Sequence, residues 1–300
     1  MAVPDAGLPL RFGWFLVPNA ADPSSLVAEA RLAERAGFDL IGIQDHPYQR
    51  RYFDTFTLLA ALATATERVG LFPDVACLPL RHPAMLAKAS VSIDLLSGGR
   101  FDLGLGAGAF WDAIVAMGGP RRAPGEAVEA LEEAIAVLRL LWSDQRSVRF
   151  TGRHYRVAGV KPGPAPAQPI GIWVGASGPR MLSLIGRVAD GWVPSSPSLP
   201  PERLPAAQAR IDDAAAAAGR DPASIRRLYN ISGRVGPGGG GFLDGPAGQW
   251  VEQLLPVVTE HGMDTLVLWP TEFPARQLEL FAAEVAPALR EAVSAHRGRG

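Results

Sequence analysis

The stretch FGWFLVPNAADPSSLVAEARLAERAGFDLIGIQ, residues 12–44, predicts a strand, a helix and a second strand in succession. Phe12–Val17 and Leu40–Gln44 are short apolar runs of the kind that form buried strands. Between them, Ser24–Ala36 is rich in Ala, Leu and Glu, and Gly37 suits the left-handed end of a helix. The stretch is therefore one strand–helix unit that leads into the next strand.

The same alternation continues through the chain of 300 residues. Strands are expected at Phe12–Val17, Leu40–Gln44, Val69–Ala76, Phe101–Gly106, Ile170–Gly175, Asp190–Val193, Leu228–Gly233 and Thr265–Trp269. Several of these runs are apolar throughout, as expected for parallel strands buried on both faces. Eight such units predict an α/β fold, a single (β/α)8 TIM-type barrel with insertion segments, and a doubly wound open sheet is the alternative.

Three segments interrupt the alternation, at about 107–125, 147–168 and 236–246. Phe150–Val157 alternates about a polar turn and predicts a hairpin. The third segment is rich in glycine and predicts a loop. No linker divides the chain, so we expect one domain over residues 1–300.

Composition and charge exclude several classes of protein. The net charge is −1, so the bulk charge favours neither nucleic acid nor a membrane surface. No apolar run approaches the ~20 residues of a membrane span. Met1–Leu10 lacks the basic and apolar regions of a signal peptide. We therefore expect a cytoplasmic protein that acts on a small-molecule substrate, without a nucleic-acid or membrane partner.

The sequence offers no local metal motif. Cys77 is the only cysteine, which excludes an intrachain disulfide and a cysteine-based zinc site. None of the five histidines lies two or four residues from another. We expect no metal, although a site assembled from distant ligands stays open.

Candidate catalytic residues are those that follow the strands, because active sites of such barrels lie at the carboxyl ends of the strands. His46 follows the second strand, and histidine titrates near neutral pH and can transfer protons. A surface or structural role for His46 is the alternative. Asp45 beside it either orients the ring or caps the next turn.

Gly175–Arg180 is the best candidate for an anion site. It follows a strand, opens a helix, and has small residues where backbone N–H groups must approach a phosphate. Ser177 and Arg180 could add contacts. A tight turn that needs glycine for its geometry explains the segment equally well.

Gly104–Ala109 matches the dinucleotide pattern G-x-G-x-x-G/A only weakly, because no second strand ends in an acid about 20 residues later. We interpret it as a loop that lets a planar ring pack on the backbone. Several aromatic side chains near strand ends could line an apolar pocket, although such side chains more often fill the core. These side chains are Trp14, Phe15, Phe110, Trp111, Trp192 and Trp269.

Six motifs in order give a resemblance that covers residues 11–293. They are Gln44–Tyr48 (QDHPY), Leu78–Pro83 (LPLRHP), Leu96–Phe101 (LSGGRF), Leu103–Gly108 (LGLGAG), Gly186–Trp192 (GRVADGW) and Phe281–Pro287 (FAAEVAP). Together they resemble the luciferase-like monooxygenase superfamily, and specifically its branch that uses coenzyme F420.

The resemblance implies a barrel that usually forms a homodimer and binds a flavin or deazaflavin at the strand ends. Asp45 and His46 would lie beside the ring system, and Asp74–Val75 would be the family's non-prolyl cis peptide. The other cofactor-binding residues would be Ala76, Gly106, Ala107, Gly108, Gly175, Ala176, Ser177, Gly178 and Arg180, with Ala176–Gly178 at the phosphate.

One residue departs from the family's pattern. Sugar-phosphate dehydrogenases of this branch carry a glutamate after the glycines of the fourth strand, where this chain has Ala109. Asp112 is the nearest carboxylate in the sequence. Glucose-6-phosphate oxidation is therefore not expected, and a less polar substrate is.

Three functions compete. The leading hypothesis is an F420-dependent oxidoreductase that transfers hydride to or from a small apolar substrate, with His46 as general acid or base. The second is an FMN-dependent monooxygenase of the same superfamily that uses reduced flavin and O2. The third is a non-catalytic barrel, against which the intact pocket loops argue.

Overall fold

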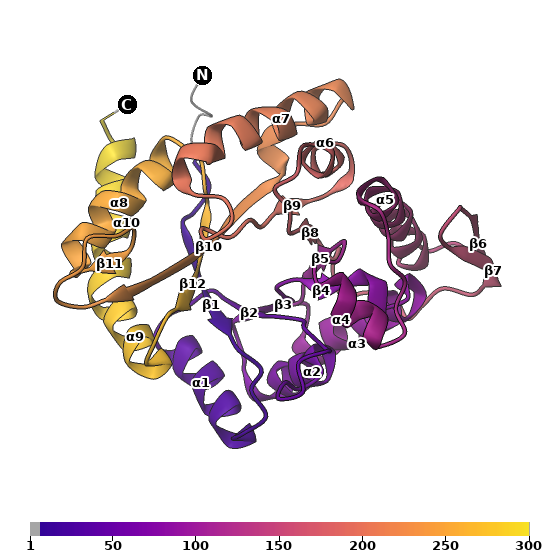
Figure 1. The fold of residues 1–300 in the computed structure, drawn as a ribbon, viewed down its shortest axis with the longest axis horizontal. Coiled ribbons are helices and arrows are strands. Elements are labelled where there is room, and N and C mark those ends of the chain that lie inside the picture. Colours follow the sequence, from indigo (N-terminus) through magenta and orange to yellow (C-terminus); the bar gives the residue numbers. More distant parts are fainter. Residues whose placement is uncertain (1–6, 300) are drawn as a thin grey trace.

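Nearly parallel strands form a barrel at the centre of the computed structural model, which describes residues 7–299 (Figure 1). Residues 1–6, part of the segment on which the expectation about a signal peptide rests, lie outside this range. Neighbouring strands follow the order β3 (Gly70–Pro73), β2 (Leu40–Ile43), β1 (Arg11–Leu16), β12 (Thr265–Pro270), β10 (Arg226–Val235), β9 (Gly191–Trp192), β8 (Ile172–Val174), β5 (Leu103–Gly106) and β4 (Ala76–Cys77).

The ring closes between β3 and the start of the β5 segment. Leu71 pairs with Phe101 in a parallel bridge, the Leu71 N–H donates to Arg100, and the Asp102 N–H donates back to Leu71. The predicted barrel is therefore confirmed, and the open sheet is excluded. The expected third strand, Val69–Ala76, is divided into β3 and β4 at the cis peptide Asp74–Val75.

Helices cover the outside of the barrel (Figure 1). They are α1 (Pro23–Arg35), α2 (Thr55–Ala65), α3 (Pro83–Ser97), α4 (Trp111–Ala116), α5 (Pro124–Leu141), α6 (Pro179–Val188), α7 (Leu204–Ala217), α8 (Ala247–Thr259), α9 (Pro274–Leu280) and α10 (Ala286–Arg297). Asp22 caps α1 by accepting from the backbone N–H groups of Ser24 and Ser25. Within residues 7–299, no helix has the length and apolar character needed to cross a membrane.

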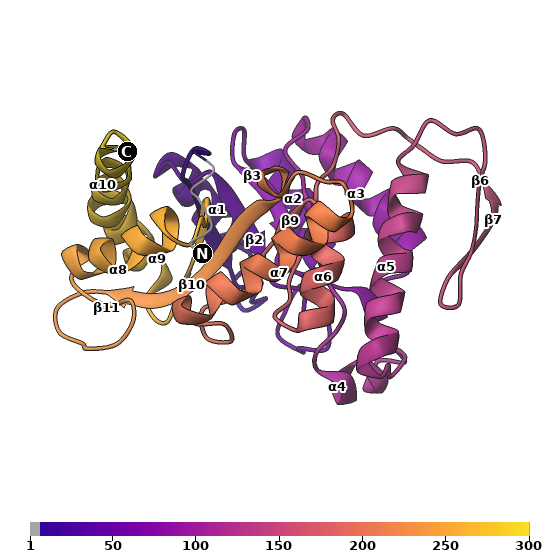
Figure 2. The same ribbon diagram turned by 90° about the horizontal axis from the view of Figure 1, so that it is seen from above.

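The segments between regular units form structure of their own. The predicted hairpin consists of β6 (Val148–Thr151) and β7 (Arg156–Val160), which project beyond α5 (Figure 2). Glu133 of α5 holds its turn by accepting from the backbone N–H groups of Arg153, His154 and Tyr155 at 2.7–3.0 Å. In the glycine-rich segment, β11 (Asp244–Gly245) adds to β10.

Side chains of each strand alternate between the interior of the barrel and the layer beneath the helices. Phe15, Leu40, Phe72, Trp173, Val193, Leu228 and Val267 form the inner cluster. Trp14 and Leu16, on either side of Phe15, belong to the outer core. Gly42 makes room inside, since a Cβ there would lie 2.8 Å from the Phe72 ring. On each strand, the residue two positions after a member of this inner cluster, toward the carboxyl end, therefore faces the mouth of the barrel.

Candidate active site

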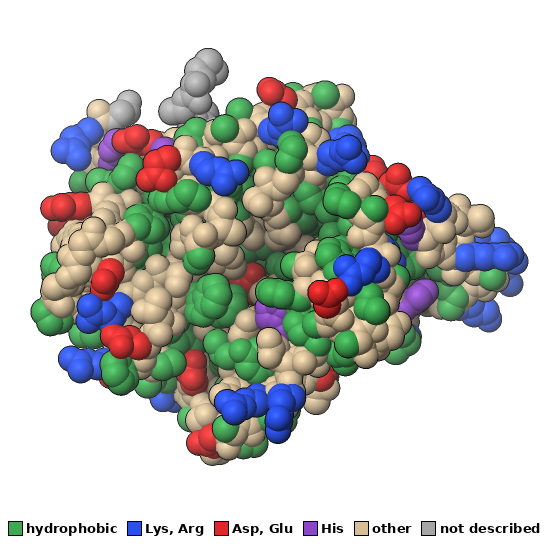
Figure 3. All heavy atoms as spheres, viewed as in Figure 1, with side chains coloured by type: hydrophobic (Ala, Val, Ile, Leu, Met, Phe, Trp, Pro, Cys, Tyr) green, Lys and Arg blue, Asp and Glu red, His purple; other side chains and the backbone are tan. Residues whose placement is uncertain are grey.

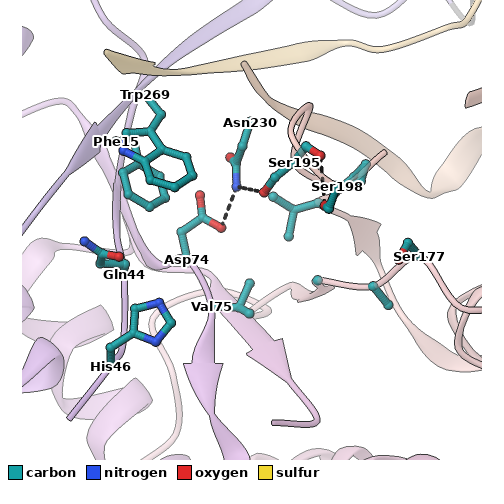
Figure 4. A pocket seen from close by; sticks show the side chains of 14 residues that line it. Phe15, Gln44, His46, Asp74, Val75, Ser177, Ser195, Ser198, Asn230 and Trp269 are labelled. Atoms are coloured by element: carbon teal, nitrogen blue, oxygen red, sulfur yellow. Dashed lines mark hydrogen bonds between the residues drawn. The ribbon is translucent and has the colours of Figure 1, made fainter. Parts of the chain in front are cut away.

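A cavity of about 280 Å³ opens at the carboxyl ends of the strands. It is lined by Phe15, Gln44, His46, Asp74, Val75, Gly175, Ala176, Ser177, Val193, Pro194, Ser195, Ser198, Asn230 and Trp269 (Figure 4). Figure 3 shows that this face of the molecule is hollowed near its centre, with hydrophobic side chains around the hollow. The place agrees with the rule for barrel enzymes.

Strand periodicity explains why these residues meet. Gln44, the first residue after β2, lies two residues beyond Gly42, and Trp269 lies two residues beyond Val267 on β12. Asp74 follows Phe72, and Asn230 follows Leu228, at the same spacing. Because alternate residues share a face of a strand, each residue continues the inner cluster toward solvent.

Three glycines leave space for the Val75 side chain at the cavity. The peptide bond between Asp74 and Val75 is cis, as expected from the resemblance. A Cβ at Gly106 would lie 2.7 Å from Val75 Cγ2, and one at Gly175 would lie 3.0 Å from the same atom. At Gly104 a Cβ would collide with the Pro73 carbonyl oxygen. The two glycines of β5 and Gly175, directly after β8, therefore permit the close approach of Val75.

Asp74 is a buried carboxyl group beside the cavity, with 7% of its surface exposed. Its Oδ1 accepts a hydrogen bond from Asn230 Nδ2 at 3.1 Å, and its buried Oδ2 has no partner. Burial raises the pKa of Asp74 to about 7, although the Asn230 hydrogen bond acts in the opposite direction. The carboxyl therefore changes charge near neutral pH.

His46 stands across the cavity from these groups (Figure 4). Its Nδ1 lies 2.6 Å from the Tyr48 hydroxyl, and its ring meets the Phe110 ring edge-to-face at 5.4 Å. Burial lowers the pKa of His46, and the neighbouring Asp45 opposes this shift. Its imidazole is therefore mainly neutral at pH 7, with Nε2 left for a ligand.

Asp45 lies behind the lining of the cavity, and its expected place beside the ring system stays a prediction. Its side chain is fully buried and accepts from Arg81 Nε and Nη2, both at 2.7 Å, and from the Cys77 N–H at 2.8 Å. Arg81 also contacts Asp54, the N-cap of α2, at 2.5 Å. Asp45 therefore ties the end of β2 to the segment that follows β4.

The aromatic residues divide into three groups. Trp269 stacks on Phe15 at 4.8 Å, and this pair forms one wall of the cavity. Trp14 and Trp192 are fully buried and line no part of it, which corrects the expected pocket. Trp14 and Trp192 lie next to the inward-facing Phe15 and Val193, so both point outward, toward the helices. Trp14 Nε1 donates to a carboxylate oxygen of Glu29, and Trp192 Nε1 donates to the Ala176 carbonyl oxygen. Phe110 and Trp111 also lie outside the lining; Phe110 is exposed beside His46.

The expected cofactor loops are only partly in the cavity. Gly175, Ala176 and Ser177 line it. Gly178 is the N-cap of α6, and Arg180 is exposed in the first turn of that helix, so both lie beyond the cavity.

The glycine loop after β5 does not line the cavity either. Gly106 makes room for Val75, and Gly108 makes room for Pro79, which would lie 2.7 Å from an added Cβ. Ala107 and the fully buried Ala76 are likewise outside the lining. The loop therefore lies behind Val75, outside the lining of this cavity, and its contact with the ring stays a prediction.

Asn230 and Ser198 were missed in the sequence, whereas Ser195 lies in the expected strand-end segment 192–196. Asn230 is a polar residue within an apolar strand, two positions beyond Leu228. Because alternate residues share a face of a strand, its spacing from Leu228 could have predicted that it lies at the mouth of the barrel. Ser195 and Ser198 lie on a loop after β9 that carries no such periodicity. Within residues 7–299, no His, Cys, Asp and Glu side chains gather as a possible metal site.

The fold and the cavity define an α/β-barrel protein with a ligand site at the carboxyl ends of its strands. A family model described as luciferase-like monooxygenase matches residues 10–236. The chain is 37% identical over 221 residues to an F420-dependent hydroxymycolic acid dehydrogenase of Mycobacterium tuberculosis, covering 70% of this chain and 59% of that protein.

A second relative in sequence and a solved structure are also F420-dependent enzymes by name. The chain is 32% identical to an F420-dependent glucose-6-phosphate dehydrogenase of Microbacterium testaceum, over 75% of this chain and 68% of that one. The structure of an F420-dependent secondary alcohol dehydrogenase with an F420–acetone adduct superposes with a TM-score of 0.81 at 19% identity, covering 94% and 99% of the two chains. The chain belongs to the luciferase-like monooxygenase family.

Proposed function

We propose that the protein is an oxidoreductase that uses coenzyme F420 and transfers hydride to or from a small, largely apolar organic substrate. The observation that carries this proposal is the cavity at the barrel mouth, where His46 faces Val75 across a space bounded by the Phe15–Trp269 pair. The names of the two F420-dependent relatives support the choice of cofactor.

The cavity offers a fit for the cofactor's ring. The glycines at 106 and 175 hold Val75 at the wall, and Gln44, Asp74 and Asn230 supply polar groups. When bound, F420 supplies a carbon that accepts or donates hydride. The phosphate is assigned to Ala176, Ser177 and the amino-terminal turn of α6, whose unpaired N–H groups favour an anion.

His46 has the proton-transfer role. A hydride that leaves an alcohol carbon must be matched by a proton leaving its oxygen, and a neutral imidazole can accept that proton. The lowered pKa of His46 keeps the ring in the accepting form at neutral pH. In the reverse direction the same nitrogen returns the proton to a carbonyl oxygen.

The proposed substrate is not a sugar phosphate. Ala109 replaces the expected glutamate, and the nearby Asp112 is 97% exposed in its side chain and pairs with Arg121 at the surface. No carboxylate of the described cavity lining other than Asp74 faces the site. A small secondary alcohol or ketone suits the lining better than a phosphorylated sugar.

We also infer a homodimer from an exposed face on α2 and α3, which pack against each other. Met85 and Leu96 of α3 are 67% and 55% exposed. Thr57, Ala61 and Thr64 of the neighbouring helix α2 are small exposed residues. Sedimentation should give twice the chain mass, and a monomer at micromolar concentration would refute this assignment.

Anaerobic incubation with F420 and a panel of secondary alcohols tests the proposal, by following loss of the oxidised cofactor's visible absorbance. Reduction by at least one apolar alcohol, and none by glucose 6-phosphate, is expected. Turnover that needs FMN, a flavin reductase and O2 would instead identify the monooxygenase.

A further inference from the structure

We propose that Asp74 and Asn230 form a neutral acid–amide pair that carries one proton, and that this proton is required for the cavity to accept an anionic heterocycle. Asp74 directly follows β3, and Asn230 lies on β10. Their side chains meet in the wall of the cavity (Figure 4). The inference deepens the proposed function and rests on it for the identity of the heterocycle, a deazaflavin.

Each member of the pair has one buried oxygen atom without a hydrogen-bond donor. Asn230 Nδ2 donates to Asp74 Oδ1 at 3.1 Å and to Ser195 Oγ at 3.2 Å. The remaining oxygens, Asp74 Oδ2 and Asn230 Oδ1, are both buried without a partner. Figure 4 shows these two oxygens on the same side of the pair.

One proton resolves both deficits. When Asp74 is ionised, its Oδ2 and the Asn230 Oδ1 are both acceptors, and a buried acceptor without a donor destabilises the folded protein. Protonated on Oδ2, Asp74 donates to Asn230 Oδ1 while Asn230 Nδ2 donates to Asp74 Oδ1. The pair then closes a ring of two hydrogen bonds, and no charge remains under the cavity.

The surroundings favour the neutral form. Burial raises the pKa of Asp74 to about 7. Among the described residues that line the cavity, His46 is the other titratable side chain; the rest are apolar, amide, hydroxyl or glycine residues from the other strand ends. Behind the lining, Arg81 pairs with both Asp45 and Asp54. His46, with its lowered pKa, titrates on the acid side of the relevant range.

The consequence is a proton taken up with the ligand. The 8-hydroxy-deazaflavin ring carries negative charge at neutral pH, and an ionised Asp74 would repel it. Above the pKa of Asp74, the affinity for F420 should fall about tenfold for each pH unit, until the pKa of the occupied site is reached. Below the pKa of Asp74 in the ligand-free protein, the affinity should be nearly constant.

Asp74→Asn separates this account from a merely structural role. The new amide donates to Asn230 Oδ1 and accepts from Asn230 Nδ2, so it imitates the protonated acid without titrating. Ser195→Ala is the matched control, because it removes an acceptor of Asn230 Nδ2 but leaves the pair intact. F420 fluorescence titrations from about pH 6 to about pH 9 cover the range around the expected pKa.

The parent and Ser195→Ala should bind F420 with the same loss of affinity above pH 7, whereas Asp74→Asn should bind equally at all pH values and more tightly than the parent at pH 9. Infrared spectra of the ligand-free protein should contain a carboxylic-acid C=O band that fades near pH 7 and is missing in Asp74→Asn. An unaltered pH dependence in Asp74→Asn, or no such band, overturns the proposal. If F420 binds none of the proteins, the proposed function fails, and the infrared band still decides the state of the pair.

Discussion

His46 is the residue whose replacement separates chemistry from binding. His46→Ala should leave the F420 dissociation constant within a few-fold of the parent and slow turnover by roughly 10²–10⁴, the usual share of acid–base catalysis. Because burial lowers the pKa of His46 below its ordinary 6.5, protonation of this ring should reduce alcohol oxidation only on the acid side of that value. A profile of kcat/KM against pH measures the pH at which activity falls on the acid side.

Tyr48→Phe is the control for His46, because it removes only the hydroxyl that lies 2.6 Å from Nδ1. Its effect on turnover should be smaller than that of His46→Ala. Weak F420 binding by His46→Ala, with single-turnover hydride transfer intact, would mean that the histidine only packs against the ring.

Asp74 should also make stability depend on pH. An aspartate in the unfolded chain titrates near pH 3.8, whereas Asp74 in the folded protein titrates near 7. The folded state therefore keeps a proton that the unfolded chain releases, and stability falls as pH rises from about 4 to 7. The three-unit difference corresponds to at most about 4 kcal/mol.

Asp74→Asn should remove this fall. Urea unfolding of both proteins at pH 5 and pH 8 measures it, because other titrating groups contribute equally to the parent and the variant. The free energy of unfolding should drop more between the two pH values in the parent. An equal drop in both proteins would show that Asp74 is ionised at pH 5.

At the scale of single strands, sequence periodicity carried more information than the apolar runs alone. The apolar runs located the strands. Alternation then shows which residues share a face of a strand, but one residue must be known to face the interior before the inner face can be identified. Phe15 faces the interior, so Trp14 faces the helices and could not line a pocket. A polar residue in phase with Leu228, Asn230, could have been found by the same reasoning. The ion pair of Asp45 with Arg81 joins residues 36 positions apart, and no local pattern encodes it.

The β5 strand tolerates no side chain where it passes β3 and Val75. In Gly104→Ala the added methyl group would collide with the Pro73 carbonyl oxygen, and this overpacking should cost about 1–3 kcal/mol of unfolding free energy. Gly178→Ala is the matched control, since its backbone φ is −76° and nothing lies within 4 Å of the new atom. That control should stay within about 0.5 kcal/mol in urea unfolding. Equal stability of the two variants would mean that β5 can move away from Pro73.

Helix α6 is the element that should hold the cofactor's phosphate. Arg180→Ala removes a cation from its first turn, and losing a charge-assisted contact of about 1.5–3 kcal/mol weakens binding roughly tenfold to a hundredfold. Arg187→Ala, at the other end of the same helix and paired with Glu132 at 2.9 Å, is the control and should bind F420 normally. If Arg180→Ala binds like the parent, the phosphate lies elsewhere.

For the whole molecule, the count of strand–helix units was enough to predict a barrel. It was not enough to predict how the ring closes. Closure depends on the Leu71–Phe101 bridge and on the division of the third strand at Asp74–Val75, both of which bring together backbone that no local pattern pairs. The hairpin of β6 and β7 was predictable because alternation and a turn lie within one short segment.

The identity of the cofactor tests the account most directly. The purified protein is titrated with F420 and, under the same conditions, with FMN, and binding is followed by fluorescence. The account predicts that F420 binds more tightly and that an alcohol then reduces it without oxygen. Tighter binding of FMN, together with turnover that requires oxygen, would contradict it.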